Sequence, residues 1–172
     1  MSSSMSDEDI AKAAELLARF EPGFLPYPVF EQIARLVALP ILEFVPLRAH
    51  NGVIEVLLIA RPEDDAYWPG LLHTPGTVIR ATDVHTEDMQ NWPAIDRILH
   101  DELQDTEVGA PRYVGSILHN SKRGAEQAQL YWVEVIGEPK VGNFYNVKAL
   151  PDGLIDSQVA FIVEAARQFQ QR

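Results

Sequence analysis

Apolar residues recur at helical spacing in the first forty residues of the chain and predict two helices. Ser6, followed by three acidic residues, is typical of a helix N-cap, and apolar positions then follow on one face from Ile10 to Phe20. Pro22-Gly23 ends this helix, and a second helix is predicted over 29–38. We therefore expect residues 1–40 to form a helical N-terminal extension that packs on the rest of the protein.

After residue 40 the pattern changes to short apolar runs, which are typical of strands. The run over 53–60 is nearly continuous in apolar residues, so we expect a strand that is covered on both faces. The other predicted strands span residues 41–47, 77–80, 112–118, 129–136 and 144–147.

Two further helices are predicted in the second half of the chain. Pro93 suits a first helical turn, and an apolar stripe then runs to about Glu107. The last helix spans 156–170, with an expected inner face of Val159, Ile162, Val163, Ala166 and Phe169. This irregular alternation predicts an α/β (α+β) fold over residues 41–172, a sheet with helices packed on it.

Charge and composition narrow the functional classes. The 172 residues carry 25 acidic against 14 basic side chains, a net charge of −11. Such a chain repels phosphate backbones and anionic lipids, so we expect no nucleic acid and no membrane as partner. The absence of cysteine excludes thiolate metal sites and cysteine nucleophiles, and with no targeting segment recognised we expect a cytoplasmic protein.

An acidic cluster in the predicted 93–107 helix is the main candidate for chemistry. Glu102 and Asp105 are three residues apart, and Asp101 and Asp105 four, which places them one turn apart on a helix. Like charges at this spacing destabilise a helix, and a divalent cation such as Mg²⁺ would neutralise them. The alternative is a solvated acidic face in a protein that is acidic throughout.

The order of motifs along the chain gives this cluster a context. Trp68 precedes a Pro75-Gly76 turn, a strand and the acidic helix with Glu102-Leu103, and an aromatic strand and a last helix follow. This order resembles the Nudix hydrolase family, whose signature is G-x5-E-x7-R-E-U-x-E-E-x-G-U, with U a bulky apolar residue. The resemblance covers 41–172 and implies a Nudix-like mixed sheet sandwiched between helices.

The signature is altered, and it can be aligned in two registers. In the preferred register Glu102 matches the glutamate after the arginine, Asp83 replaces the first glutamate, and Asp101 replaces the arginine. Asp105 and Thr106 then stand at the paired glutamates. The usual seven-residue spacer is longer by ten residues.

In the second register Arg97 takes the arginine position and Asp101-Glu102 the paired acids. Ile98 then replaces the first helical glutamate, and the signature runs past the predicted end of the helix.

The resemblance implies metal-dependent hydrolysis of a nucleoside diphosphate linked to another moiety, with activity weakened or redirected by the altered signature. It implies Mg²⁺ or Mn²⁺ as cofactor, Glu102, Asp105 and Asp83 as metal ligands, and Glu102 as the catalytic residue. The expected partner is a small phosphorylated, nucleotide-like molecule. The alternative is a ligand-binding or regulatory module of the same fold that has lost catalysis.

Residues outside the signature are candidates for binding the ligand. Arg61 and Arg80 could each grip a phosphate or simply close a strand end. Trp68 could stack on a ring or pack within its loop. The segment 84–91 could cover the site, supply acids or be a surface insertion, and residues 1–40 could mediate a homodimer.

Overall fold

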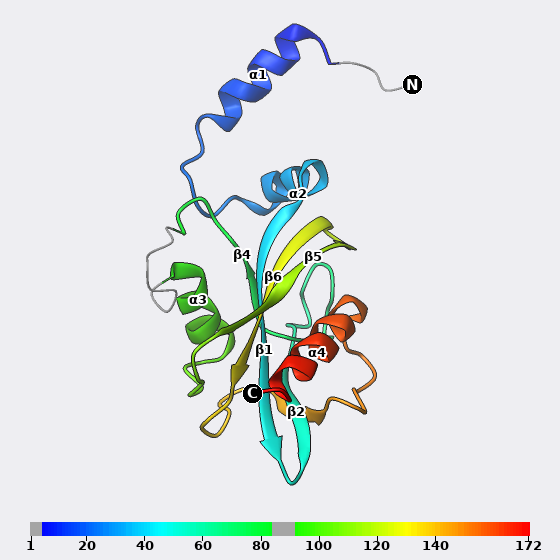
Figure 1. Cartoon of the computed structure of the whole chain (residues 1–172). Coiled ribbons are helices and arrows are strands. Elements are labelled where there is room, and N and C mark those ends of the chain that lie inside the picture. The colour runs from blue at the N-terminus through cyan, green and yellow to red at the C-terminus, as the bar shows by residue number, and fades with distance from the viewer. Residues whose placement is uncertain (1–4, 84–91) are drawn as a thin grey trace.

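A mixed seven-stranded sheet forms the centre of the computed structural model, which describes residues 5–83 and 92–172 (Figure 1). The helices are α1 (Asp7–Leu17), α2 (Tyr27–Leu36), α3 (Pro93–Arg97), the π-helix η2 (Ile98–Glu102) and α4 (Asp156–Phe169). The strands are β1 (Leu39–His50), β2 (Val53–Ala60), β3 (Leu72–His73), β4 (Gly76–Val78), β5 (Arg112–Ser121), β6 (Gly124–Glu134) and β7 (Asn143–Asn146).

Strand β1 organises the sheet because it pairs with three other strands. The main order is β3-β2-β1-β6-β5, with β4 added to β1 and β7 to β2. Among the strands of the described residues, β1 and β6 pair in parallel, and the other strand pairs are antiparallel. Near its beginning β1 pairs with β4, which places Glu43 opposite Gly76.

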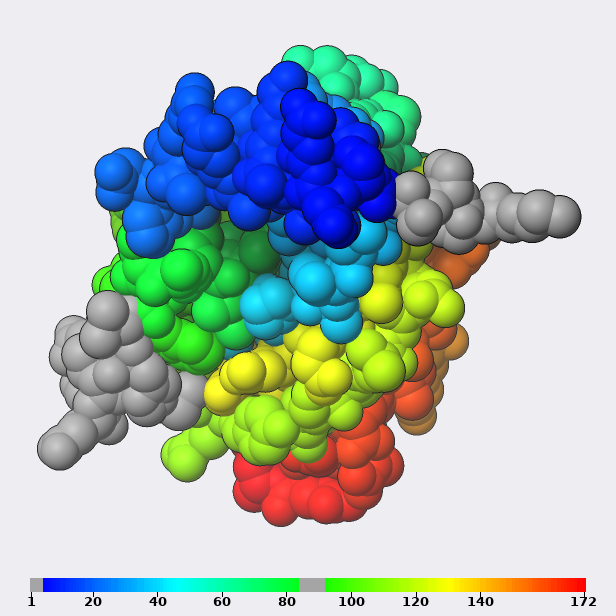
Figure 2. Space-filling view, turned by 90° about the horizontal axis from the view of Figure 1, so that it is seen from above, coloured from blue at the N-terminus to red at the C-terminus, as the bar shows by residue number. Residues whose placement is uncertain are grey.

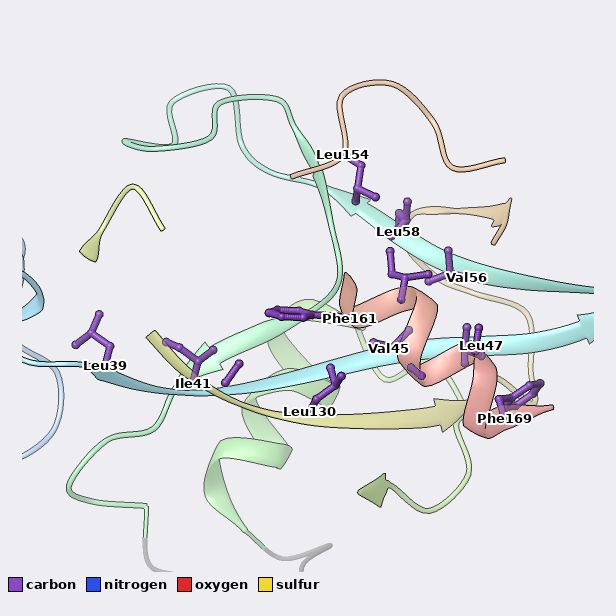
Figure 3. Packing of buried hydrophobic residues seen from close by; sticks show 14 of the residues in the cluster. Leu39, Ile41, Val45, Leu47, Val56, Leu58, Leu130, Leu154, Phe161 and Phe169 are labelled. Carbon is purple, nitrogen blue, oxygen red and sulfur yellow. The ribbon is translucent and has the colours of Figure 1, made fainter. Parts of the chain in front are cut away.

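The two faces of the sheet carry separate cores, because successive strand residues point to opposite sides. On one face Ile41, Val45 and Leu47 of β1 pack with Phe161 and Phe169 of α4 (Figure 3). The opposite face packs against α3 and η2 through Leu42, Phe44, Leu57, Tyr131, Val133, Trp92, Ile95, Ile98 and Leu103. The predicted sheet sandwiched between helices is therefore confirmed.

The buried face of α4 is only partly the predicted one, with Ile162, Ala166 and Phe169 buried as expected. Val159 and Val163 are 41% and 55% exposed, whereas Phe161 is 2% exposed and lies in the core. Gln158 is also buried, and its side-chain oxygen is satisfied by a hydrogen bond from the Thr74 N–H at 2.7 Å. The buried face of α4 thus includes a polar residue, and hydrophobicity alone selects a face that is rotated from it.

The helix that begins at Pro93 ends earlier than predicted. It widens into a π-turn, in which the Leu103 N–H donates to the Ile98 carbonyl five residues back at 2.9 Å. Gln104 and Asp105 then take left-handed φ angles of 49° and 57°, which end the helix. Asp105 therefore lies beyond the helix, and the predicted one-turn spacing from Glu102 does not hold.

The N-terminal extension packs only in part. Ala34 of α2 is 1% exposed, and Phe30 packs against the core that the sheet forms with α4. A Cβ at Gly124 would lie 2.5 Å from the Ala34 carbonyl oxygen, so the β5–β6 turn sits directly under α2. Helix α1 buries none of its residues and projects past the end of the sheet (Figure 1), contrary to the packing expected for it.

The structure gives little information on two points of organisation, the division of the chain at residue 40 and its relation to a membrane. Strand β1 begins at Leu39, and the division into an extension over 1–40 and a domain over 41–172 stays a proposal. Within residues 5–83 and 92–172, no helix is long and apolar enough to span a membrane.

Candidate functional site

A cleft of about 860 Å³ lies between the N-terminal extension, β4 and the end of η2. Figure 2 shows it as a hollow between the blue N-terminal segment, the cyan α2 and the green segment that follows β4. Its polar end is lined by Arg61, Arg80, Glu102 and Arg123, and most of the rest is apolar. Both arginines predicted to bind the ligand, and the predicted catalytic glutamate, thus line one cleft.

Arg61 is held at the end of β2 by the loop that follows. Its Nε donates to Asp65 Oδ2 at 2.9 Å, and Nη2 contacts the same oxygen. The other carboxylate oxygen of Asp65 accepts from the N–H groups of Tyr67 and Trp68 at 3.0 and 2.8 Å. Burial opposes ionisation of Asp65, but these hydrogen bonds outweigh it and lower its pKa to about 2. Arg61 is therefore positioned by a permanently ionised partner.

In this structure Trp68 packs within its loop, which is one of the two alternatives that the sequence left open. It is 8% exposed, and the Arg123 guanidinium lies 5.1 Å from its ring centroid. It borders a smaller cavity of about 40 Å³ and does not line the large cleft.

Arg80 is the arginine on the cleft whose charge is least shared. Its guanidinium lies 5.5 Å from the Phe24 ring centroid, and among the described residues no carboxylate oxygen lies within 4.0 Å of it. Its backbone N–H donates to Asp83 Oδ2 at 2.7 Å, which fixes the strand end. The Arg80 side chain therefore lines the cleft without an ion-pair partner among the described residues.

Asp83 is paired with Arg97 and does not point to Glu102. The two carboxylate oxygens accept from Arg97 Nη1 and Nη2 at 2.5 and 2.8 Å, and Nη2 also donates to the Val78 carbonyl at 3.2 Å. The hydrogen bonds from Arg97 are the main cause of the lowered pKa of Asp83. This ion pair gives Arg97 a buried acidic partner, and the choice between the two registers of the signature stays a prediction.

The Asp83–Arg97 pair should contribute measurably to stability. The Asp83 side chain is 1% exposed, so Arg97→Gln leaves a buried carboxylate without its cation. We expect a loss of about 2–4 kcal/mol in the free energy of unfolding, measured by urea denaturation.

Asp105→Asn provides the control for this substitution. Asp105 is 63% exposed and meets only His100, at 3.3 Å, so its loss should change stability by less than about 0.5 kcal/mol. Equal effects of the two substitutions would contradict the structural role given to Arg97.

Glu102 lies against His73 at the polar end of the cleft. Glu102 Oε2 is 3.8 Å from His73 Nε2, and His73 Nδ1 donates to the Thr74 carbonyl at 2.8 Å. Burial is the main cause that lowers the pKa of His73 to about 4 and raises the pKa of Glu102. At neutral pH His73 is therefore an uncharged neighbour of Glu102.

The three carboxylates expected to bind a metal do not come together. Asp83 is engaged by Arg97, Asp105 is exposed beside His100, and Glu102 lies next to His73. Across residues 5–83 and 92–172, no three acidic or histidine side chains form a group that could hold a metal ion. The donor set does not fit Mg²⁺ or Mn²⁺, which take several oxygen ligands. The segment 84–91, considered above as a source of acids, lies outside the described residues.

Sequence reasoning missed a buried acid beside this site. Glu43 is 7% exposed, and its Oε2 accepts from the Thr74 hydroxyl at 3.2 Å. A Cβ at Gly76 would lie 2.6 Å from the Glu43 carboxyl carbon, so glycine there makes room for the acid. Burial is the main cause that raises the pKa of Glu43 to about 8. The available signal was a single acid inside the apolar run of β1.

A second buried acid, Glu126, lies across the small cavity from the first. It accepts from Arg123 Nε at 2.7 Å and from the Ser121 hydroxyl at 2.8 Å, with His119 Nε2 at 3.5 Å. These contacts hold Arg123 in place between the small cavity and the large cleft. The signal for Glu126 was its position on the inward-facing side of β6, in line with Ala128 and Leu130.

Comparison with known proteins gives matches in structure alone. No family model matches the chain, and no curated protein matches its sequence. The NUDIX domain of Shewanella oneidensis NrtR, solved with ADP ribose, matches with a TM-score of 0.56 at 18% identity, over 96% of this chain and 99% of that one.

Two other structures give the same picture. The C-terminal domain of mouse MUTYH, solved with human PCNA, matches with a TM-score of 0.57 at 13% identity, over 78% of this chain and 91% of that one. A MutT NUDIX hydrolase from Burkholderia pseudomallei matches with a TM-score of 0.53 at 17% identity, over 76% and 97%. With its sheet order and flanking helices, the chain has the Nudix fold.

Proposed function

We propose that this protein binds a small phosphorylated, nucleotide-like ligand in the large cleft and does not hydrolyse it. One observation carries the proposal: a chain with a net charge of −11 gathers Arg61, Arg80 and Arg123 on one cleft. The ADP ribose bound by the similar NrtR domain supports a ligand of this chemical class.

The arginines differ in what they offer to a phosphate. Arg61 and Arg123 are each held by a carboxylate, from Asp65 and Glu126, and this fixes the direction of their remaining N–H groups. Among the described residues no carboxylate oxygen lies within 4.0 Å of the Arg80 guanidinium, although its charge interacts with nearby Asp83, so Arg80 is the least engaged of the three. Guanidinium groups donate two parallel hydrogen bonds to phosphate oxygens, and charge-assisted bonds of this kind are strong.

The scattered carboxylates support binding without hydrolysis. Nudix hydrolases generally use divalent metals, and metal-assisted attack of water requires carboxylates that hold the metal in one place. Asp83 and Asp105 have other partners, and of the three carboxylates expected to bind a metal Glu102 alone lines the cleft.

Calorimetric titration with ADP-ribose in EDTA tests this proposal. We expect saturable binding without metal, and an affinity at least about tenfold lower in Arg80→Gln. Arg112→Gln is the matched control, because Arg112 is exposed on β5, does not line the cleft and carries the same charge. Equal losses in the two variants, or no binding to the wild type, would contradict the proposal.

A second candidate function, weak phosphoanhydride hydrolysis, is favoured by the position of Glu102. Its carboxylate faces the cleft beside uncharged His73, where it could accept a proton from an attacking water. If this function holds, Glu102→Gln abolishes turnover with little change in thermal stability. Unchanged turnover in that variant would remove Glu102 as the catalytic residue.

Three expectations from the sequence stay predictions. These are the absence of nucleic-acid and membrane partners, a cytoplasmic location, and a homodimer formed through residues 1–40.

A further inference from the structure

The apolar wall of the cleft is supplied largely by the N-terminal extension. Leu17 ends α1, Phe20 and Phe24 lie in the connection that follows, and Tyr27 and Phe30 come from α2. The same segment forms the blue and cyan border of the hollow in Figure 2. The apolar wall is thus made largely by residues that precede the sheet.

These apolar side chains remain accessible to solvent. Phe24 is 79% exposed, Leu17 48%, Tyr27 46% and Phe20 39%, and α1 buries nothing. A group of large apolar side chains left exposed on one concave surface is typical of a ligand or partner site.

The wall is held in position by contacts outside the cleft. Helix α2 is fixed by Ala34, whose carbonyl packs on Gly124, and the Tyr27 ring lies 6.2 Å from the ring of Tyr67. An ideal Cβ at Gly23 would lie 3.5 Å from Thr82 Cγ2, so the connection also rests on the loop after β4. The apolar surface is therefore formed before any ligand arrives.

Arg80 lies on the cleft where the apolar wall meets the polar end. Its guanidinium lies 5.5 Å from the Phe24 ring, and it has no carboxylate partner in the part of the chain that the structure describes. The polar side chains Thr77, Glu102 and Arg123 lie with it on the cleft. A complementary ligand carries an anion at one end and apolar surface along the rest.

We infer that the cleft takes an organic phosphate whose remaining part is largely apolar, and that the N-terminal extension selects this part. The inference rests on the proposed function, because the phosphate must first be held by Arg80. A cleft of about 860 Å³ is within the range of small-molecule sites, roughly 300–1,000 Å³.

Calorimetric titration of the intact chain in EDTA, at one salt concentration, tests the inference with three probes. These are inorganic pyrophosphate, geranyl diphosphate, which adds a ten-carbon apolar chain, and geraniol, which lacks the phosphates. We expect geranyl diphosphate to bind about 10- to 100-fold more tightly than pyrophosphate, because its chain leaves water for the apolar wall.

A pair of variants assigns the gain to the extension. Phe24→Ser should lower the affinity for geranyl diphosphate at least about fivefold, whereas Leu36→Ser should leave it unchanged. Leu36→Ser is the control: Leu36 lies in the same extension and is 65% exposed, but it does not line the cleft. Both side chains are mostly exposed, so neither change should prevent folding.

Each alternative outcome has a distinct meaning. If Arg80-dependent pyrophosphate binding is seen but the apolar chain adds nothing, the inference fails and the proposed function stands. If geraniol binds as tightly as its diphosphate, the cleft takes a purely apolar partner and the inference is overturned. If none of the phosphorylated probes binds but ADP-ribose does, the inference fails and the proposed function stands. If ADP-ribose does not bind either, both fail.

Discussion

Gly76→Ala should lower the free energy of unfolding by about 2–4 kcal/mol, although it adds a single methyl group. The new Cβ would lie 2.6–2.8 Å from the carboxyl atoms of Glu43. Glu43 is buried in β1 and bonded to the Thr74 hydroxyl, so its carboxyl group cannot easily move away. Urea denaturation of the variant and the wild type measures the difference.

Two further variants identify the cause. Gly115→Ala is the control on β5, because nothing lies within 4 Å of an added Cβ there. Glu43→Ala combined with Gly76→Ala should cost less than the sum of the two single changes, since the clash is removed. Equal stability of Gly76→Ala and Gly115→Ala would show that Glu43 does not occupy the space above Gly76.

Glu43→Gln should stabilise the protein at pH 8 and above, and have little effect near pH 5. Burial raises the pKa of Glu43 from 4.5 to about 8, so the folded protein keeps a proton that the unfolded chain has lost between these values. The wild type therefore loses stability as pH rises through this range, by up to about 1.4 kcal/mol per pH unit. Glutamine keeps the shape and the acceptor for Thr74 but does not titrate.

The measurement is the difference in unfolding free energy between Glu43→Gln and the wild type from pH 5 to pH 9. We expect this difference to grow by about 4 kcal/mol in favour of the variant over the range. Glu15→Gln, at a largely exposed position on α1, is the control for the loss of one carboxylate. A flat difference for Glu43→Gln would mean that its carboxyl group is not buried as described.

Most of the fold could be predicted because it depends on local patterns. Alternation along β1 places Ile41 and Leu47 on one face and Leu42 and Phe44 on the other, and this produces the two cores. The continuous apolar run of β2 correctly indicated a strand covered on both faces, since successive residues Val56 and Leu57 are both buried. Helix α2 and the beginnings of α3 and α4 also lie close to the predicted positions.

The site could not be predicted in the same way because its contacts join distant parts of the chain. Asp83 is held by Arg97, fourteen residues away, and the Thr74 N–H is satisfied by Gln158 on α4. The acids of η2 were misplaced because a π-turn and left-handed residues end the helix before Asp105, which no helical periodicity reveals. Spacing along the chain therefore could not show which side chains pair at this site.

Incubation of ADP-ribose with the protein and Mg²⁺ or Mn²⁺, followed by ³¹P NMR, tests the central claim most directly. We expect the ligand to be bound, with or without metal, and recovered with its diphosphate intact. Release of AMP and ribose 5-phosphate that requires the metal and disappears in Glu102→Gln would contradict the claim. In that case the scattered carboxylates would have to form a working metal site after all.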